Sequence, residues 1–184
     1  MLVLILILLI LAYTGFLVYQ VVFENRSLFN LKTWNPLAYE KGVPMGGELD
    51  AGKAPVQLLI HATKDPMSED LERVQVIKGW VDASGKSHEK IYDAARAKVT
   101  RESVNLDTAR TDHAGGKAQF AILWTDPDYD ASHNAFYYVR VLEMPKVRHT
   151  HLDALALKED PSVTQHDSTI RERAFSSPIW VNAN

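Results

Sequence analysis

The sequence predicts a mainly β protein, an antiparallel two-layer β-sandwich preceded by one N-terminal transmembrane helix. From Pro55 onward, short apolar runs alternate with turn residues at spacings of about ten to twenty residues, as in sandwiches. One run, 134–143, is long and rich in aromatic and β-branched residues, which favours a central strand. At the N-terminus, no charged residue occurs from Leu2 to Phe23. We therefore divide the chain into a transmembrane anchor (1–23), a connector (24–53) and a β-sandwich domain (54–184).

The apolar N-terminal run is long enough for a membrane span. As a helix, the stretch from Leu2 to Phe23 extends roughly 33 Å, and a bilayer core is about 30 Å thick. A cleavable signal peptide fits less well, because no basic residue precedes the run and no Ala-x-Ala site occurs before the polar residues begin at Glu24. A start codon placed too far upstream is the third interpretation. Arg26 and Lys32 favour a cytoplasmic location for the domain after the span, but Glu24 makes this bias small.

Six strands and two short helices account for the part after the connector. The turn from Asp82 to Gly85 predicts a hairpin, because Gly supplies the left-handed conformation that such turns need. Two segments look helical, Thr150 to Leu157 and Thr169 to Phe175. The strands are placed at 56–62, 72–82, 87–93, 117–125, 134–143 and 178–182. The expected core residues are Val76, Trp80, Phe120, Ile122, Trp124, Tyr138, Leu142 and Trp180.

The central strand, 134–143, has two faces that are both largely apolar. Alternation places Phe136 and Tyr138 on one face with Arg140, and Tyr137 and Val139 on the other. We therefore expect the strand to be covered on both sides. Arg140 must then reach a carboxylate or extend to an edge, because an unpaired buried charge is costly.

Composition excludes several classes of function. The net charge of −3 gives no basic footprint, so we expect no nucleic-acid partner. The chain has no cysteine, which excludes disulfides, thiolate catalysis and cysteine-based zinc sites. No Gly-x-Ser-x-Gly motif is present, and the glycine-rich connector lacks the Lys-Ser or Lys-Thr pair of a phosphate-binding loop. We expect no cofactor and no catalytic residue.

Asp126, Asp128 and Asp130 form a turn with carboxylates at alternate positions, a spacing that lets one loop wrap a hard cation. The calcium-loop pattern fails, because Ala131 stands where Gly is required and Tyr137 where a bidentate Glu is required. We therefore expect a turn whose aspartates bind nearby backbone N–H groups, without a metal.

His149 and His151 are the other candidate metal ligands. Two histidines one residue apart can bind zinc or manganese on a strand, and Asp153 is near. A site needs further ligands, however, and Lys146 and Arg148 would repel a dication. A solvated basic loop is the preferred interpretation.

A group of charged residues near the C-terminus suggests structural ion pairs. Arg171, Glu172 and Arg173 carry alternating charge, and the central strand carries Arg140 and Glu143. We expect this set to hold the C-terminal segment onto the sandwich rather than to form an active site.

Seven stretches of the chain carry a resemblance to a known family: 38–47, 64–66, 73–80, 88–93, 124–130, 136–143 and 170–180. Through them, the chain from residue 38 to the end resembles the C-terminal region of the bacterial proteins called domain of unknown function 3604. The resemblance implies a relation to PHP-like metallohydrolases, in which an α/β metal-binding portion precedes a β-rich tail. It also implies that this chain is the tail without that portion, as a fragment or an anchored stand-alone domain.

Two functions are implied by this resemblance. In the first, the chain is a membrane-anchored accessory domain that packs on a PHP-like catalytic domain or binds another protein. In the second, it is a stand-alone metal-dependent hydrolase that uses His149 and His151. The first is preferred, because a hydrolytic metal centre needs three or more protein ligands. The resemblance to exported proteins implies a periplasmic β domain.

Overall fold

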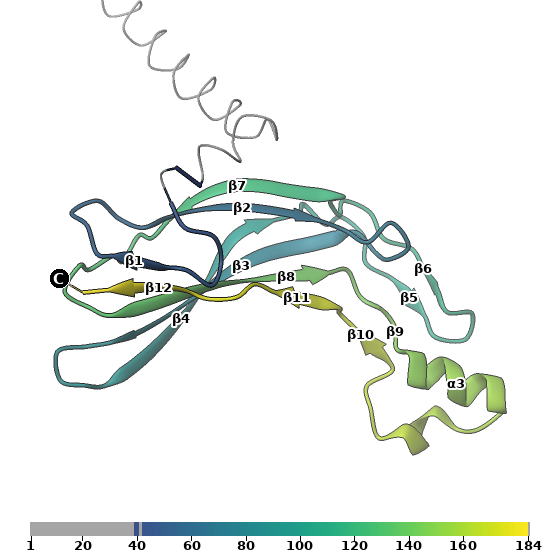
Figure 1. The fold of residues 1–184 in the computed structure, drawn as a ribbon. Helices are drawn as coiled ribbons and strands as arrows, with labels where there is room; N and C mark the ends of the chain where they lie inside the picture. The colour runs from purple at the N-terminus through teal and green to yellow at the C-terminus, as the bar shows by residue number, and fades with distance from the viewer. Residues whose placement is uncertain (1–38, 41, 184) are drawn as a thin grey trace, which may run out of the picture. The chain divides into compact units, whose positions relative to one another are not determined.

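The computed structural model describes residues 39–40 and 42–183 (Figure 1). Contacts divide the chain into two units, Met1–Pro44 and Met45–Asn184, and every strand of the described residues lies in the second unit. The predicted helix from Leu2 to Phe23 lies outside the described residues. Within the described ranges, no helix is both long enough and apolar enough to cross a membrane.

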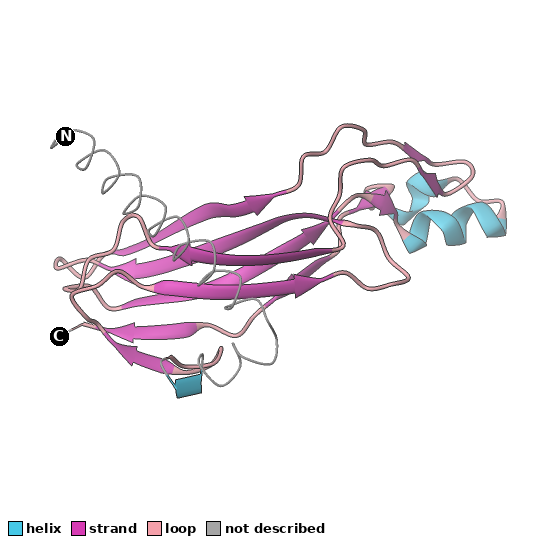
Figure 2. Cartoon of the chain, turned by 90° about the horizontal axis from the view of Figure 1, so that it is seen from above, coloured by secondary structure: helices cyan, strands magenta, loops and turns pink. Residues whose placement is uncertain are grey.

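A six-stranded sheet forms the larger layer of the fold (Figures 1 and 2). Its order is β1-β12-β8-β3-β4, and β11 also pairs with β8. All pairs are antiparallel except β1 with β12, which run parallel. The strands are β1 (Glu48–Asp50), β3 (Leu71–Val81), β4 (Ser87–Arg96), β8 (Ala135–Glu143), β11 (Arg173–Phe175) and β12 (Ile179–Asn182).

Three smaller strand pairs and one helix complete the unit. β2 (Gln57–Thr63) pairs with β7 (Gln119–Thr125), β5 (Val104–Asn105) with β6 (Arg110–Thr111), and β9 (Lys146–Val147) with β10 (Thr169–Ile170). Helix α3 (His149–Leu157) and the short 3-10 helix η1 (Pro161–Thr164) connect β9 to β10. The mainly β prediction with antiparallel sheets is confirmed, because α3 has only 9 residues.

The core lies between the β2–β7 pair and one face of the six-stranded sheet. Leu58 and Ile60 of β2 join Phe120 of β7 in one apolar cluster with Val74 and Val76 of β3. Figure 1 shows β2 and β7 running over the larger sheet. β2 alternates buried and exposed residues, so one of its faces meets the core and the other faces solvent.

The opposite face of the six-stranded sheet, here called the outer face, is exposed at Ile91, Phe175 and Trp180, whereas Ile77 at its centre is buried. Gly79 and Phe136 are register partners there, and a Cβ built on Gly79 would lie 2.3 Å from Cζ of Phe136. The Phe136 ring therefore lies across the glycine. Trp180 is 47% exposed, so its predicted place in the core is wrong. β8 is the middle strand of the sheet, as expected, and all of its residues are buried or half-buried.

Each predicted strand is found within a few residues of its expected position. The hairpin is confirmed, because Gly85 has φ 82° and its N–H donates to the carbonyl of Asp82 at 2.9 Å. The helix expected from Thr169 to Phe175 is wrong. Its residues form β10 and β11 instead, because pairing with β9 and β8 outweighs local helix propensity. β1 is an unpredicted strand within the segment expected to be a connector.

Candidate functional site

A buried network of charges and phenols occupies the end of β7, where the aspartate turn begins. Nζ of Lys78 lies 2.6 Å from Oδ2 of Asp126, and the Tyr137 hydroxyl donates to the same oxygen at 2.7 Å. Lys78 also donates to the carbonyl of Asp128 at 2.8 Å. The Lys78 and Asp126 side chains are 5% and 0% exposed. Each charge is therefore matched by an opposite charge and by further hydrogen bonds.

The pattern of β3 explains why Lys78 is buried. Val74, Val76 and Lys78 alternate along the strand and share its inner face, and Val76 is fully buried. Two aromatic rings accommodate the ammonium, at 5.4 Å from the ring centre of Trp80 and 5.7 Å from that of Tyr137. A lysine on the apolar face of a strand was the signal in the sequence for this site, and the sequence-based prediction missed it.

The next aspartate of the turn is also paired, at the surface. Asp128 contacts Nζ of Lys90 and accepts from the Tyr92 hydroxyl at 2.7 Å. The hydrogen bond from Lys90, followed by that from Tyr92, lowers the pKa of the Asp128 carboxyl. Burial, followed by the hydrogen bond to Asp128, raises the pKa of Tyr92. Two lysines thus sit beside the two carboxylates that a cation would use.

The aspartates also hold the turn through its backbone, as the sequence predicts. Asp126 accepts from the N–H of Asp128 at 2.9 Å, and Asp130 accepts from the N–H of Ser132 at 2.9 Å. Among residues 39–40 and 42–183, no group of three His, Asp or Glu side chains is arranged to hold a metal ion. The geometry of Asp126, Asp128 and Asp130 is that of a turn braced by lysines.

His149 and His151 do not converge on one point. Both belong to α3, where residues two apart point to different sides of the helix. His149 is exposed, whereas His151 is buried and its Nε2 lies 3.3 Å from the carbonyl of Leu106. A single ion between the two imidazoles would require a strand, and this segment is a helix.

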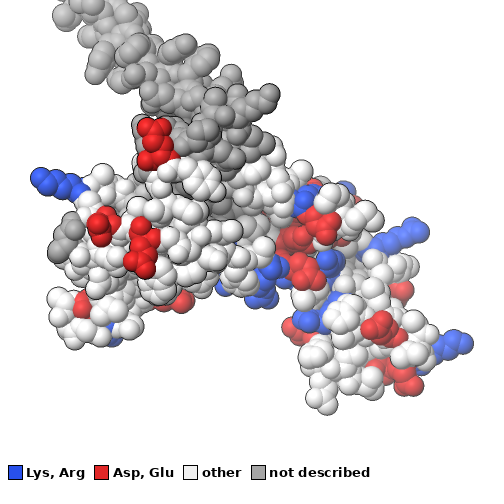
Figure 3. Space-filling model, viewed as in Figure 1, with Lys and Arg blue, Asp and Glu red and all other residues white. Residues whose placement is uncertain are grey.

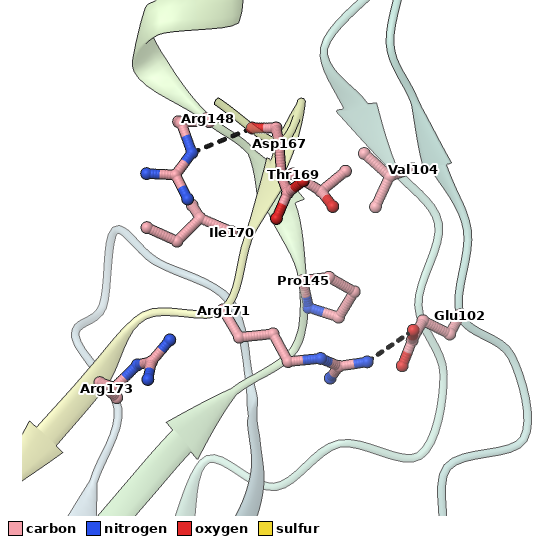
Figure 4. A pocket seen from close by; sticks show the side chains of 9 residues that line it. All are labelled: Glu102, Val104, Pro145, Arg148, Asp167, Thr169, Ile170, Arg171 and Arg173. Atoms are coloured by element: carbon pink, nitrogen blue, oxygen red, sulfur yellow. Dashed lines mark hydrogen bonds and ion pairs between the residues drawn. The ribbon is translucent and has the colours of Figure 1, made fainter. Parts of the chain in front are cut away.

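A pocket of about 410 Å³ opens where β5, β9 and β10 approach the start of α3 (Figure 4). Arg148 donates from Nε to the carbonyl of Asp167 at 3.0 Å. Arg171 reaches across the pocket, and its Nη2 lies 2.7 Å from Oε1 of Glu102. The lining residues are Glu102, Val104, Pro145, Arg148, Asp167, Thr169, Ile170, Arg171 and Arg173.

Beside this pocket, arginines surround the buried carboxylate of Glu72. Arg73 and Arg96 approach its Oε1 at 3.3 and 3.4 Å, and Arg171 contacts its Oε2. Acidic and basic side chains mix at the end of the sheet nearest α3 (Figure 3). The expected role of Arg171 in holding the C-terminal segment is therefore met through Glu72 and Glu102, two partners that the sequence did not suggest.

The other members of that expected charge set behave differently. Arg140 donates from Nε and Nη2 to the side-chain oxygen of Gln75, at 2.9 and 2.6 Å. Gln75 in turn donates to Asp93 at 2.7 Å, so the arginine reaches a carboxylate through an amide. Lys146 lies 3.7 Å from Glu172 and 3.9 Å from Glu143. The set therefore forms separate groups of contacts, and the Arg173 side chain makes no hydrogen bond or ion pair with a described residue.

Aromatic side chains of the outer face form a continuous ladder across three strands. Phe136 lies 5.3 Å from Trp180 and 6.3 Å from Tyr138, and Tyr138 lies 6.4 Å from Phe175, between ring centres. Phe175 and Trp180 are 56% and 47% exposed. On the same face, Ile91 of β4, which lies beyond β3 in the sheet, is 47% exposed. An apolar surface of this kind is a typical feature of protein interaction sites.

Comparison with known proteins gives one family. The family model described as "Protein of unknown function (DUF3604)" matches residues 20–183. No curated protein and no solved structure gives a significant match to the chain.

Proposed function

This chain belongs to the DUF3604 family, and on that premise we propose that it is an accessory domain that binds a partner protein through the outer face of its six-stranded sheet. The observation that carries this proposal is the exposed aromatic ladder of Phe136, Tyr138, Phe175 and Trp180. Tyr, Trp and Phe are the residues enriched in protein interfaces, and partly exposed rings lose water readily on binding.

The charges that border the ladder indicate the chemistry of the partner. Ile77, on β3, pairs in register with Ile91 of β4 and Tyr138 of β8, which places all three on the outer face. Glu89 and Asp93 flank Ile91 on that face and are exposed. The complementary surface is therefore apolar at its centre, with lysine or arginine facing β4.

The partner that we propose is a metal-binding domain of the PHP-like metallohydrolase type. The resemblance of residues 38 onward to the tail of such proteins supports this choice, because a tail that normally continues from a catalytic domain has a face that meets it. In this proposal the run from Leu2 to Phe23 anchors the chain in the membrane, and the β domain lies in the periplasm.

A binding measurement with purified proteins tests the interaction. The full chain is purified in mild detergent, and the N-terminal portion of a longer DUF3604 protein is expressed separately as the probe. We expect binding that weakens at least about tenfold in the Phe175→Ser, Trp180→Ser double variant. Leu123→Ser is the control, because Leu123 is 40% exposed on β7, away from the outer face.

The proposal fails if the probe does not bind, or if the double variant binds as the wild type does. A second copy of this chain is the other possible occupant of the apolar face. Sedimentation of the full chain alone tests for such a dimer. A dimer that the double variant dissociates would replace the partner proposed here.

We propose no catalytic role for this chain alone. Hydrolase activity from His149 and His151 requires them to share a metal, but their side chains point to different sides of α3. Phosphomonoester and phosphodiester assays with added manganese or zinc should show no turnover. Turnover that disappears in a His149→Ala, His151→Ala double variant would establish the enzyme instead.

A further inference from the structure

We propose that the pocket beside α3 binds a small organic anion, one that carries a carboxylate or phosphate together with hydroxyl groups. The pocket shares no residue with the aromatic ladder, and the proposal does not depend on the partner protein. Its volume of about 410 Å³ falls within the usual range for small-molecule sites.

The first argument is that the arginines of this pocket are not equivalent. Arg171 is already engaged by the carboxylates of Glu72 and Glu102. Arg148 donates from Nε alone, so its two terminal nitrogens have no partner among the described residues. Arg173 makes no side-chain hydrogen bond or ion pair to any residue that the structure describes, and it is exposed. Two guanidinium groups therefore remain available to a ligand.

The second argument is the geometry of these groups. The terminal nitrogens of a guanidinium form a planar fork that matches the oxygens of a carboxylate or phosphate. In Figure 4, Arg148 and Arg173 lie on the same side of the pocket, with Ile170 between them. Backbone pairing places both arginines, since Arg173 pairs with Leu142 of β8 and the N–H of Arg148 donates to the carbonyl of Ser168.

The other lining residues indicate which chemical groups the anion carries besides its charge. Val104, Pro145 and Ile170 supply apolar wall for a carbon skeleton. Thr169 offers a hydroxyl, and the carboxylate of Asp167 makes no hydrogen bond or ion pair with a described residue. Asp167 repels a bare anion but accepts hydrogen bonds from hydroxyl groups, so the pocket suits a hydroxylated anion better than inorganic phosphate.

Calorimetric titration of the full chain in detergent tests this assignment. The probes are glucose 6-phosphate, glucuronate, inorganic phosphate and neutral glucose. We expect one or both of the sugar anions to bind more tightly than inorganic phosphate, and glucose not to bind. Binding of glucose 6-phosphate alone identifies the charged group as a phosphate, and binding of glucuronate alone identifies it as a carboxylate. Binding should weaken as salt rises from about 0.05 to about 0.5 M.

Variants locate the site. Arg148→Gln and Arg173→Gln should each weaken binding at least about tenfold, and Arg173→Lys should recover only part of the loss. Lys86→Gln removes one charge in the β3–β4 hairpin, at the other end of β3, and should bind as the wild type does. The Phe175→Ser, Trp180→Ser variant should also retain anion binding, which separates this site from the proposed partner surface.

The proposal is overturned if no anion binds, or if glucose binds as well as its phosphate does. Affinities that are equal in the wild type and both glutamine variants would show ionic association elsewhere on the chain, and would overturn it too.

Discussion

Nζ of Lys78 and Oδ2 of Asp126 lie 2.6 Å apart, with side chains that are only 5% and 0% exposed. Tyr137 and the backbone carbonyl of Asp128 complete the hydrogen bonding of this pair. The pair joins β3 to the turn after β7, so it links the two layers of the fold. A buried charge pair can mark a functional site. Here both charges are paired and hydrogen-bonded, which is typical of a structural pair.

Removal of one partner from this pair should be strongly destabilising. Lys78→Met leaves the Asp126 carboxylate buried without a counter-charge, and we expect the free energy of unfolding to fall by about 3–5 kcal/mol. Lys90→Met, which breaks the half-exposed pair with Asp128, should cost much less, because solvent screens that pair. Urea denaturation measures both. Equal losses in the two variants would show that the buried pair contributes no more to stability than the half-exposed pair does.

Calcium should not stabilise the aspartate turn. Lys78 and Lys90 already neutralise Asp126 and Asp128, and a dication would have to displace at least one of them. Millimolar calcium should therefore leave the unfolding temperature of the wild type unchanged. A rise that is absent in Asp128→Ala would contradict this expectation and restore the metal interpretation.

Two glycines with similar backbones should respond differently to alanine. Gly85 has φ +82° and open space around its missing side chain, whereas Gly115 has φ +91° and a Cβ there would lie 2.1 Å from the carbonyl oxygen of Lys98. We expect Gly85→Ala to cost about 1–2 kcal/mol, because of the left-handed conformation. Gly115→Ala should cost more than about 3 kcal/mol, because backbone must also move. Similar losses in the free energy of unfolding, measured by urea denaturation, would mean that the backbone around Lys98 moves at little cost.

The regular parts of the sheet could be predicted because their signals are local. The run ending in Glu143 is rich in aromatic and β-branched residues, and a hairpin is specified by Asp82 and Gly85 alone. The strand β11, Arg173–Phe175, lacks such a signal, because it forms only where it pairs with β8. β1 is only 3 residues long and pairs with a strand at the far end of the chain.

The candidate sites were harder to predict, because they are built from distant residues. The partners Lys78 and Asp126 are 48 positions apart. Alternation along β3 shows a lysine on an apolar face, which indicates that a carboxylate must meet it without showing which one. The sequence indicates still less about the pocket arginines. Which of them keeps free N–H donors depends on Glu72 and Glu102, and only the folded chain brings these two carboxylates to Arg171.

High pH should weaken the fold through Tyr137. Burial, followed by the hydrogen bond to Asp126, raises the pKa of its phenol above the ordinary value of about 10. The folded protein thus keeps a proton that the unfolded chain loses. The resulting stabilisation is complete below about pH 10 and is lost as pH rises toward the folded pKa.

Tyr137→Phe removes both the hydrogen bond and this pH dependence. Near neutral pH, the variant should be less stable than the wild type by about 1.5–3 kcal/mol, the usual range for a hydrogen bond to a charged group. Between about pH 10 and 12, its free energy of unfolding should fall less steeply than that of the wild type. Tyr39→Phe, which removes a tyrosine that is 71% exposed, is the control and should keep the wild-type slope. If all three proteins lose stability in parallel in urea denaturation at these pH values, Tyr137 is not the group responsible.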